Sequence, residues 1–187
     1  MRIIGGEFRG RTLAPVPRDG VRPTADPVRE ALFNILGQQL DGRSFVDLGA
    51  GTGAVGLEAY SRGARPIALV EKDRKALITI RRNIELLESG GVALQGVILA
   101  SEDVPKWLRQ DAPRLLPQID LAFLDPPYGL PKLGSWLTAL FESGCLRAES
   151  LVVVEHRSGD VPSIPTGLAL RWTRRYGDSS LTGLALD

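Results

Sequence analysis

The sequence is poor in cysteine and long apolar runs and carries almost no net charge, and each scarcity excludes a class of protein. Its single cysteine, Cys145, excludes an internal disulfide framework and a cysteine-built metal site, so no metal is expected and a reducing compartment fits best. No apolar run approaches the roughly 20 residues that span a bilayer, and the first residues lack the apolar core of a signal peptide. A formal net charge of +1 gives no strong overall field, so attraction to nucleic acid must come from a local patch. We therefore expect a cytoplasmic protein.

The 187 residues, 43% of them hydrophobic and 24% charged, are typical of one soluble globular domain. Apolar runs that predict strands alternate with segments of helical periodicity. Strands are expected at 45–48, 66–70, 97–100, 119–124 and 151–154, and helices from Pro27 to between Leu36 and Leu40 and at 54–62, 73–87, 106–109 and 133–141. Two further extended pieces after Gly167 can return as an antiparallel hairpin. This order predicts an α/β fold with a parallel sheet covered by helices on both faces.

The stretch V-D-L-G-A-G-T-G-A-V-G, residues 46–56, predicts a strand, a tight turn and a helix. Glycines allow positive φ or a close ligand, and a helix N-terminus offers unpaired N–H groups, so such a turn binds a nucleotide-like cofactor. The glycines also match the G-x-G-x-x-G pattern of dinucleotide-binding proteins, with Glu71 at the expected distance, so the turn alone does not identify the cofactor. The candidate cofactor-binding residues of the turn are Asp47, Gly49, Ala50, Gly51, Thr52 and Gly53.

Acidic residues lie in or just after the first three predicted strands. Because ligands lie across the carboxyl ends of the strands in such a sheet, Glu71 is placed to accept hydrogen bonds from both ribose hydroxyls of a nucleoside. Asp103, with Glu102 beside it, is a candidate acceptor for the exocyclic amine of an adenine, although acids also cap helices. Asp47 is expected to organise the glycine turn and to meet a cationic end of the ligand. Lys72, next to Glu71, completes the candidates of this edge.

The motif Asp125-Pro126-Pro127-Tyr128 closes the fourth apolar run and carries the most specific chemical signal. Its prolines can fix a carboxylate, a free carbonyl and an aromatic ring toward one point, although a double proline also forms simple turns. An exocyclic amino nitrogen is a poor nucleophile because its lone pair is delocalised into the base. If Asp125 and the Pro126 carbonyl accept its N–H bonds, the lone pair can attack a methyl group while Tyr128 stacks on the base. No strong general base is then required.

Together these motifs resemble the class I S-adenosylmethionine-dependent amino-methyltransferases, which methylate exocyclic amines of adenine or guanine, or a glutamine amide. The blocks M-R-I-I-G-G-x-x-R-G-R, R-P-T-x-D-x-V-R-E-A-L-F-N and a final Y-G-D narrow the resemblance to the RsmD family of bacterial 16S rRNA guanine-N2 methyltransferases. That resemblance covers nearly the full chain. It implies a Rossmann-like, doubly wound seven-stranded methyltransferase sheet, mostly parallel with an antiparallel C-terminal hairpin, preceded by a basic N-terminal β-hairpin.

The resemblance also implies S-adenosylmethionine as the cofactor and 16S rRNA, in assembled or partly assembled 30S subunits, as the partner of a monomeric enzyme. It implies that residues Arg22 to Thr24 and the following helix close over the cofactor, which makes Thr24 a further cofactor-binding candidate. Two departures from the family pattern matter. Pro27 replaces the basic residue usual between the Asp and Val of the second block, which removes one RNA contact, and Glu102-Asp103 leaves the adenine-facing acid open.

Residues 1–24 are predicted to form the basic hairpin, and residues 25–187 the methyltransferase domain, within one globular unit. The expected RNA contacts are Arg2, Arg9, Arg11, Arg22 and Arg29, which position the RNA through its phosphates. Arg171, Arg174 and Arg175 extend the patch in this interpretation. A solvated ribbon that merely covers the core is the alternative. The lone His156 is expected to be structural or at the rim, since Asp125 already serves the chemistry.

Three other functions compete with this interpretation. An NAD-dependent dehydrogenase explains the glycines and Glu71 but leaves the motif from Asp125 to Tyr128 unused. A non-catalytic RNA-binding module explains the arginines but not the cofactor turn. An adenine-N6 or other amino-methyltransferase fits the same chemistry, because the residues predict an amine acceptor without choosing the base. Cytosine or uracil C5 methylation is disfavoured because Cys145 does not follow a proline.

Overall fold

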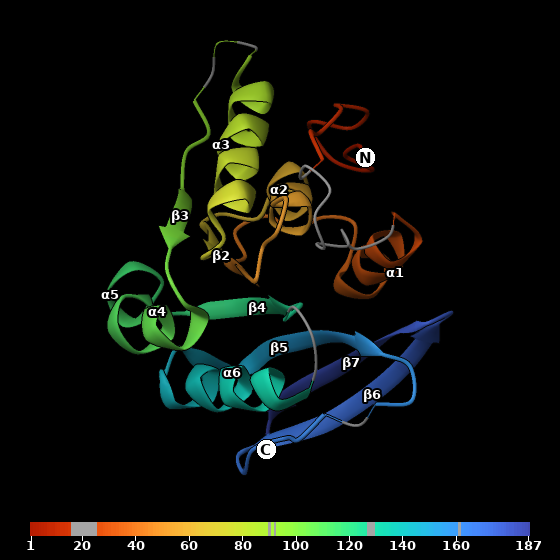
Figure 1. The fold of residues 1–187 in the computed structure, drawn as a ribbon, viewed down its shortest axis with the longest axis vertical. Helices are drawn as coiled ribbons and strands as arrows, with labels where there is room; N and C mark the ends of the chain where they lie inside the picture. The colour runs from red at the N-terminus through yellow and green to blue at the C-terminus, as the bar shows by residue number, and fades with distance from the viewer. Residues whose placement is uncertain (16–25, 90, 92, 127–129, 161) are drawn as a thin grey trace.

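The computed structural model describes residues 1–15, 26–89, 91, 93–126, 130–160 and 162–187, which form a seven-stranded sheet with helices on both faces (Figure 1). The strand order is β3-β2-β1-β4-β5-β7-β6. The strands are β1 (Phe45–Leu48), β2 (Ile67–Glu71), β3 (Val97–Ser101), β4 (Ile119–Leu124), β5 (Leu146–Arg157), β6 (Leu168–Tyr176) and β7 (Ser179–Leu186). The helices are α1 (Asp26–Leu36), α2 (Ala54–Ser61), α3 (Arg74–Glu88), α4 (Val104–Gln110), α5 (Ala112–Leu115) and α6 (Leu130–Glu142).

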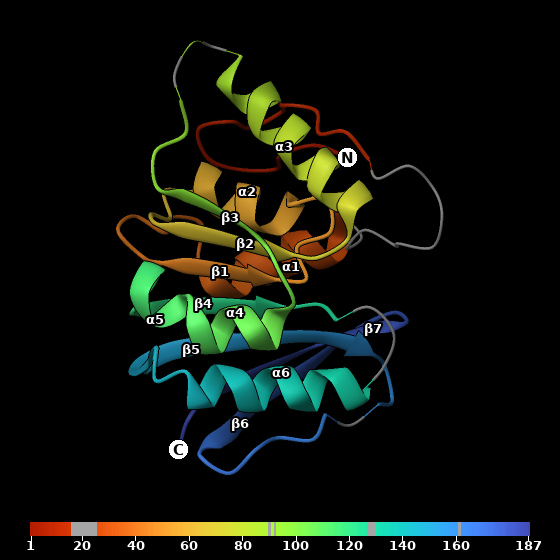
Figure 2. The same cartoon turned by 60° about the vertical axis from the view of Figure 1, so that its left-hand side comes forward.

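Strands β1 to β5 are parallel, whereas β7 runs antiparallel to both β5 and β6. The chain winds outward from β1 through β2 to β3 on one side, and continues through β4 and β5 on the other (Figure 2). The order therefore reverses between β1 and β4, which is where open α/β sheets leave a crevice for a ligand.

Two hydrophobic clusters cover the two faces of the sheet. One face packs against α1, α2 and α3 through side chains such as Phe33, Leu57 and Ile80, all fully buried. The other face packs against α4, α5 and α6, with Trp107 and Leu137 in its centre. Because parallel strands are buried on both faces, β1 and β2 read as continuous apolar runs, apart from Asp47 in β1 and Glu71 at the end of β2.

The fold class predicted from the sequence is confirmed, including the antiparallel C-terminal pair and the end of α1 at Leu36. Two extents differ. Strand β5 begins at Leu146 rather than at residue 151, because Leu146 pairs with Ile119 of β4. A shift in register between the two strands accommodates the polar residues that separate Leu146 from Leu151. The short helix α5 was not predicted.

The N-terminal β-hairpin is not confirmed. Within residues 1–15 the one β-type pairing is an isolated antiparallel bridge between Arg2 and Thr12, and turns occupy the residues between. Three backbone hydrogen bonds join the two arms, from Ile3 to Arg11, from Gly10 to Ile3 and from Leu13 to Met1. The pairing does not extend into strands, because the next N–H groups, of Ile4, Gly5 and Phe8, donate to side chains of α2. The segment is a loop held on a helix.

Over the ranges that the structure describes, no helix combines the length and the apolar character needed to cross a bilayer.

Candidate active site

The glycine turn after β1 lies directly beside the end of β4. Leu48 and Leu124, the last residues of these strands, lie level with each other, and the N–H of Asp125 donates to the carbonyl of Leu48 at 3.2 Å. Gly49 has φ of 83°, and a Cβ there would lie 2.8 Å from the Asp125 carbonyl oxygen and 3.0 Å from the Trp136 ring. Only glycine fits this position, in conformation and in space. The predicted cofactor turn and the predicted acceptor residue are therefore neighbours.

The turn is fixed to β2 on its other side. The N–H groups of Gly49 and Ala50 both donate to the carbonyl of Val70, at 2.9 and 3.1 Å. Glu71, the next residue, accepts a hydrogen bond from the N–H of Gly51 at 2.9 Å through one carboxylate oxygen. Its other oxygen accepts from the N–H groups of residues 72 and 73, at 2.7 and 2.9 Å. This places the Glu71 carboxylate, with one acceptor site still unoccupied by these bonds, beside the glycine turn.

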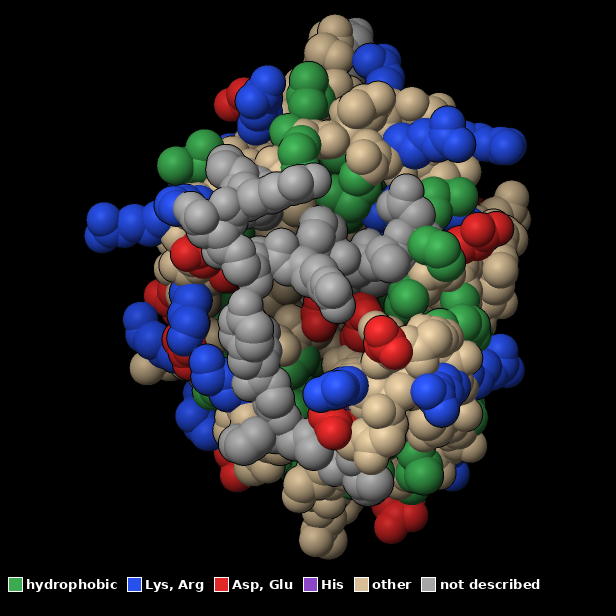
Figure 3. All heavy atoms as spheres, turned by 45° about the vertical axis from the view of Figure 1, so that its right-hand side comes forward, with side chains coloured by type: hydrophobic (Ala, Val, Ile, Leu, Met, Phe, Trp, Pro, Cys, Tyr) green, Lys and Arg blue, Asp and Glu red, His purple; other side chains and the backbone are tan. Residues whose placement is uncertain are grey.

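The other predicted acids lie along the same edge. Asp103 pairs with the ammonium of Lys72 at 2.9 Å, and both side chains are about half exposed. Glu102 accepts from Lys106 at 3.1 Å through one oxygen, while its other oxygen is buried without a hydrogen bond among the described residues. The N–H of Glu102 also donates to the carbonyl of Glu71 at 3.1 Å. In Figure 3, which shows this face of the molecule, acidic side chains gather near the centre and basic side chains lie around them.

Asp47 anchors the helix that follows the turn. Its carboxylate is buried and accepts a hydrogen bond from the N–H of Gly56 in the first turn of α2, at 2.9 Å. Burial raises the pKa of Asp47 to about 7, the Gly56 hydrogen bond opposes that rise, and the charge of Glu71 adds to it. A cationic ligand group near this carboxylate would favour its ionised form.

The turn is also joined to the N-terminal segment by Asn83, a fully buried residue of α3. The Asn83 amide nitrogen donates to the Thr52 carbonyl at 2.9 Å and to the Ala14 carbonyl at 3.2 Å. The Asn83 oxygen accepts from the N–H of Ala14 at 2.7 Å. The Asn83 side chain thus holds Ala14 of the N-terminal segment in a fixed position relative to the glycine turn.

Some predicted residues lie outside the described part of the chain. These are Arg22 and Thr24 near the N-terminus, and Pro127 and Tyr128 of the motif after β4. Their assignment remains a prediction from the sequence pattern.

The predicted RNA-contacting arginines divide into two groups. Arg2, Arg9 and Arg11 are exposed on the N-terminal segment, as an RNA contact requires. Arg29 is fully buried: its guanidinium donates to the carbonyl of Arg2 at 2.6 Å and lies 3.8 Å from the carboxylate of Glu58. In this conformation Arg29 cannot meet RNA, so its prediction as an RNA contact is wrong. The position of Arg29 in the helical repeat of α1 places it on the apolar, inward face of that helix. The prediction of an RNA contact did not take this position into account.

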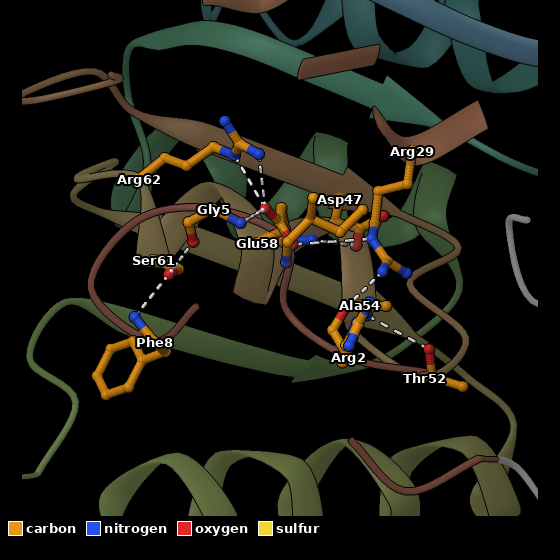
Figure 4. A network of polar contacts seen from close by, with 12 residues as sticks. Arg2, Gly5, Phe8, Arg29, Asp47, Thr52, Ala54, Glu58, Ser61 and Arg62 are labelled. Carbon is orange, nitrogen blue, oxygen red and sulfur yellow. Dashed lines mark hydrogen bonds and ion pairs between the residues drawn. The ribbon is translucent and has the colours of Figure 1, made fainter. Parts of the chain in front are cut away.

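Sequence reasoning missed Glu58, which holds the N-terminal segment on α2 (Figure 4). This fully buried carboxylate accepts from the N–H groups of Ile4 and Gly5, each at 2.7 Å, and pairs with Arg62 at 2.8 Å. Ser61, three residues on, accepts from the N–H of Phe8 at 2.9 Å. The sequence signal that could have identified Glu58 was an acid inside the otherwise apolar stretch A-V-G-L-E-A-Y. A charge buried there must be paired.

His156 has both ring nitrogens engaged. One lies 2.8 Å from the Thr182 hydroxyl and the other 3.0 Å from the carbonyl of Arg157. A ring held in this way supports the structural role expected for it.

The strand order, the glycine turn and the adjoining acid after β4 define the class I methyltransferase architecture. A family model described as Conserved hypothetical protein 95 matches residues 1–184. The chain therefore belongs to that family, the RsmD family. The chain is 35% identical over 172 residues to Ribosomal RNA small subunit methyltransferase D of Escherichia coli. The aligned residues cover 91% of this chain and 82% of that protein.

Two further similarities extend over the whole chain. Bacillus subtilis YlbH is 35% identical over 187 residues, which cover 100% of this chain and 97% of that protein. The solved structure of the yhhF protein of Escherichia coli superposes with a TM-score of 0.83 at 30% sequence identity, covering 100% of this chain and 98% of that one. The similarity thus includes the N-terminal segment as well as the sheet.

Proposed function

We propose that this protein transfers a methyl group from S-adenosylmethionine to the exocyclic N2 amine of a guanine in 16S rRNA of the small ribosomal subunit. The observation that carries the proposal is the contact at Gly49, where the cofactor turn meets the carbonyl of Asp125. A methyl donor held by the turn and an amine held by Asp125 then lie within reach of each other. The name of the Escherichia coli relative supports the rRNA substrate.

The residues of the edge fit the cofactor. The Glu71 carboxylate is held against the glycine turn by the Gly51 N–H, and Glu102 and Asp103 follow the neighbouring strand β3 on the same edge of the sheet. In our proposal Glu71 accepts the ribose hydroxyls, and Glu102 or Asp103 accepts the adenine amine. Glu102 is favoured for that contact, because its second oxygen has no hydrogen bond among the described residues, whereas Asp103 pairs with Lys72. When bound, S-adenosylmethionine supplies an electrophilic methyl group on a sulfonium.

The chain's own residues then orient the acceptor. Asp125 and the carbonyl of Pro126 follow β4 at the edge and accept the two N–H bonds of the amine, which turns its lone pair toward the methyl group. Positioning of this kind accounts for a large share of catalysis. No strong base is needed, because the nitrogen becomes positively charged as it gains the methyl group and its proton then leaves to water. Pro127 and Tyr128 belong to the site on the sequence pattern, with Tyr128 stacking on the base.

The partner in this proposal is 16S rRNA within assembled or partly assembled 30S subunits, bound by a monomeric enzyme in the cytoplasm. Guanine is proposed over adenine because of the family, since carboxylate and carbonyl acceptors fit either amine. Methylating bare 16S rRNA and partly assembled subunits, followed by mass spectrometry of the modified nucleoside, tests both points. A product of N6-methyladenosine would contradict the choice of base.

Replacing Asp125 tests the mechanism. We expect Asp125→Ala to slow methyl transfer by at least about 100-fold, because the amine loses its orienting carboxylate. Its affinity for S-adenosylhomocysteine, measured by calorimetry, should stay close to that of the wild type. Asp120→Asn is the matched control: it lies at the start of the same strand, where it bonds to Ser44 at 2.8 Å, and should leave turnover unchanged.

Two outcomes would contradict the proposal. Undiminished turnover of Asp125→Ala would remove the mechanism. Tight binding of NAD by the wild type, with no binding of S-adenosylhomocysteine, would favour the dehydrogenase instead.

A further inference from the structure

We infer that the C-terminal part of the sheet carries a second surface for the RNA backbone, formed by Arg157, Arg174 and Arg175 and called here the β6 arginine surface. The inference rests on the proposed function, because it concerns how that enzyme holds its substrate. The β6 arginine surface lies far from the N-terminal segment, on the other side of the part of the sheet edge that carries Asp125.

These arginines are exposed and form no ion pair among the described residues. Two other exposed arginines have acidic partners: Arg109 lies 3.7 Å from Glu142, and Arg114 lies 3.0 Å from Asp111. Strand β6 itself has the sequence L-A-L-R-W-T-R-R-Y, without an acid. Its positive charge is therefore not neutralised within the strand and is available to an anionic partner.

The sheet register places the surface at the level of the reaction. Leu124 of β4 lies level with Val154 of β5, so Asp125 lies level with Glu155. Glu155 pairs with Leu181 of β7, and Leu181 pairs with Arg174 of β6. Asp125 and Arg174 thus share one row of the sheet, three strand spacings apart, or about 14 Å. Nucleotides next to a bound base can span that distance.

Two contacts hold the arginines in place before any partner binds. The Arg174 guanidinium lies 5.5 Å from the centre of the Trp172 ring, and that ring lies over Gly183, where a Cβ would collide with it. The Nε of Arg175 donates to the carbonyl of Gly177 at 3.0 Å, which leaves its terminal nitrogens available. Arginines fixed in this way lose less side-chain entropy when they bind phosphate.

Arg157 joins the surface from the end of β5. It is the last residue of that strand, three beyond Val154, and it pairs across the ladder with Ser179 at the start of β7. Arg157 and Arg174 lie on one face of the sheet and Arg175 on the other, so the three arginines flank the end of the edge strand β6 where the parallel strands end. A backbone phosphate is anionic and has two non-bridging oxygens that a guanidinium group can bind bidentately, so RNA backbone is the partner that this surface fits.

The test compares two double charge reversals. Arg174→Glu with Arg175→Glu alters the β6 arginine surface. Arg114→Glu with Arg147→Glu, the matched control, makes the same charge change at the opposite edge, where Arg147 bonds to Gln118 at the start of the parallel strands. Binding of transcribed 16S rRNA is measured against salt concentration, and affinity for S-adenosylhomocysteine confirms that each variant is folded.

We expect the Arg174/Arg175 variant to bind 16S rRNA at least about tenfold more weakly and to lower the slope of log affinity against log salt by about 1 to 2, since each lost phosphate contact removes roughly 0.7 to 0.9. The control should match the wild type. Equal slopes for the two variants would overturn the inference. Normal binding of bare RNA with slow methylation of assembled subunits alone would also overturn it, because the partner would then be a ribosomal protein.

A failure of the proposed function has a different signature. In that case the wild type itself neither methylates nor binds 16S rRNA with a salt-dependent affinity. Wild-type methylation with an unaffected Arg174/Arg175 variant would instead reject only the β6 arginine surface.

Discussion

The N-terminal segment, residues 1–15, and the C-terminal pair β6–β7 both carry exposed arginines, but the two are held in place by different means. The segment rests on α2 through hydrogen bonds to Glu58 and Ser61, and on α3 through Asn83. The C-terminal pair is part of the sheet, with a ladder that runs from Leu168 to Tyr176. They lie toward opposite ends of the molecule in Figures 1 and 2.

The difference indicates where each region is vulnerable. The position of a segment held by a few buried side chains depends on those side chains, so one substitution can release it. A strand held by a ladder of backbone hydrogen bonds loses only a local contact when one side chain changes. Stability effects should therefore be large beneath the N-terminal segment and small in the C-terminal pair.

The largest effect is expected for Glu58→Ala. The substitution removes a buried carboxylate that interacts with Arg62, Arg29 and two backbone N–H groups. Breaking a buried ion pair typically costs about 3–5 kcal/mol of the free energy of unfolding. Urea denaturation gives the free energy of unfolding. The exposed Glu85→Ala is the control and should change it by less than about 0.5 kcal/mol. Similar values for both variants would show that the segment does not depend on this carboxylate.

A pair of glycine substitutions sharpens the comparison. Gly6 has φ of 75°, and a Cβ there would collide with the backbone carbonyl of Ser61, which cannot move without shifting α2. Gly6→Ala should lower the free energy of unfolding by about 3 kcal/mol. A Cβ at Gly183 would meet the partly exposed Trp172 ring, which can rotate, so Gly183→Ala should cost about 1 kcal/mol. Chemical denaturation of both variants measures the difference, and the reverse order would contradict the comparison.

The last effect concerns pH and the anchor of α2. Because the pKa of Asp47 rises on folding from 3.8 to about 7, folded protein binds a proton there that unfolded protein has lost. The stabilisation is full below pH 4 and is lost as pH rises toward 7, by at most about 1.4 kcal/mol per pH unit. Denaturation of wild type and Asp47→Asn at pH 5, 6 and 7 should show a steeper decline for the wild type. Parallel curves would mean that Asp47 does not titrate in this range.

Much of the fold could be predicted because its signals are local. The apolar run from Ile119 to Leu124 predicts β4 at its observed limits, and the periodicity from Asp73 to Leu87 predicts α3 within one residue. The N-terminal hairpin was expected from alternating residues and was not confirmed, since its arms form one antiparallel bridge and no strands. Its backbone N–H groups found acceptors on α2 that lie 53 and 54 residues away in the sequence.

The candidate site shows the same division. The glycine turn and the acids after the strands were identified by residue type and position, and the structure brings Gly49 and Asp125 together as expected. Glu58 and Asn83 escaped notice, because their role consists of contacts with backbone groups distant in the sequence. Arg29 was assigned to RNA because of its charge, whereas the packing of α1 directs it inward to Glu58.

The sequence by itself determined the order of strands and helices, the glycine turn and the acid that closes β4, because apolar periodicity, glycine spacing and strand-ending residues act over a few neighbouring positions. Tertiary structure alone decided which charges are buried and paired, how the N-terminal segment is held, and that Arg174 lies in the row of Asp125. These properties depend on the register between strands and on contacts between residues far apart in the chain, which no local pattern encodes.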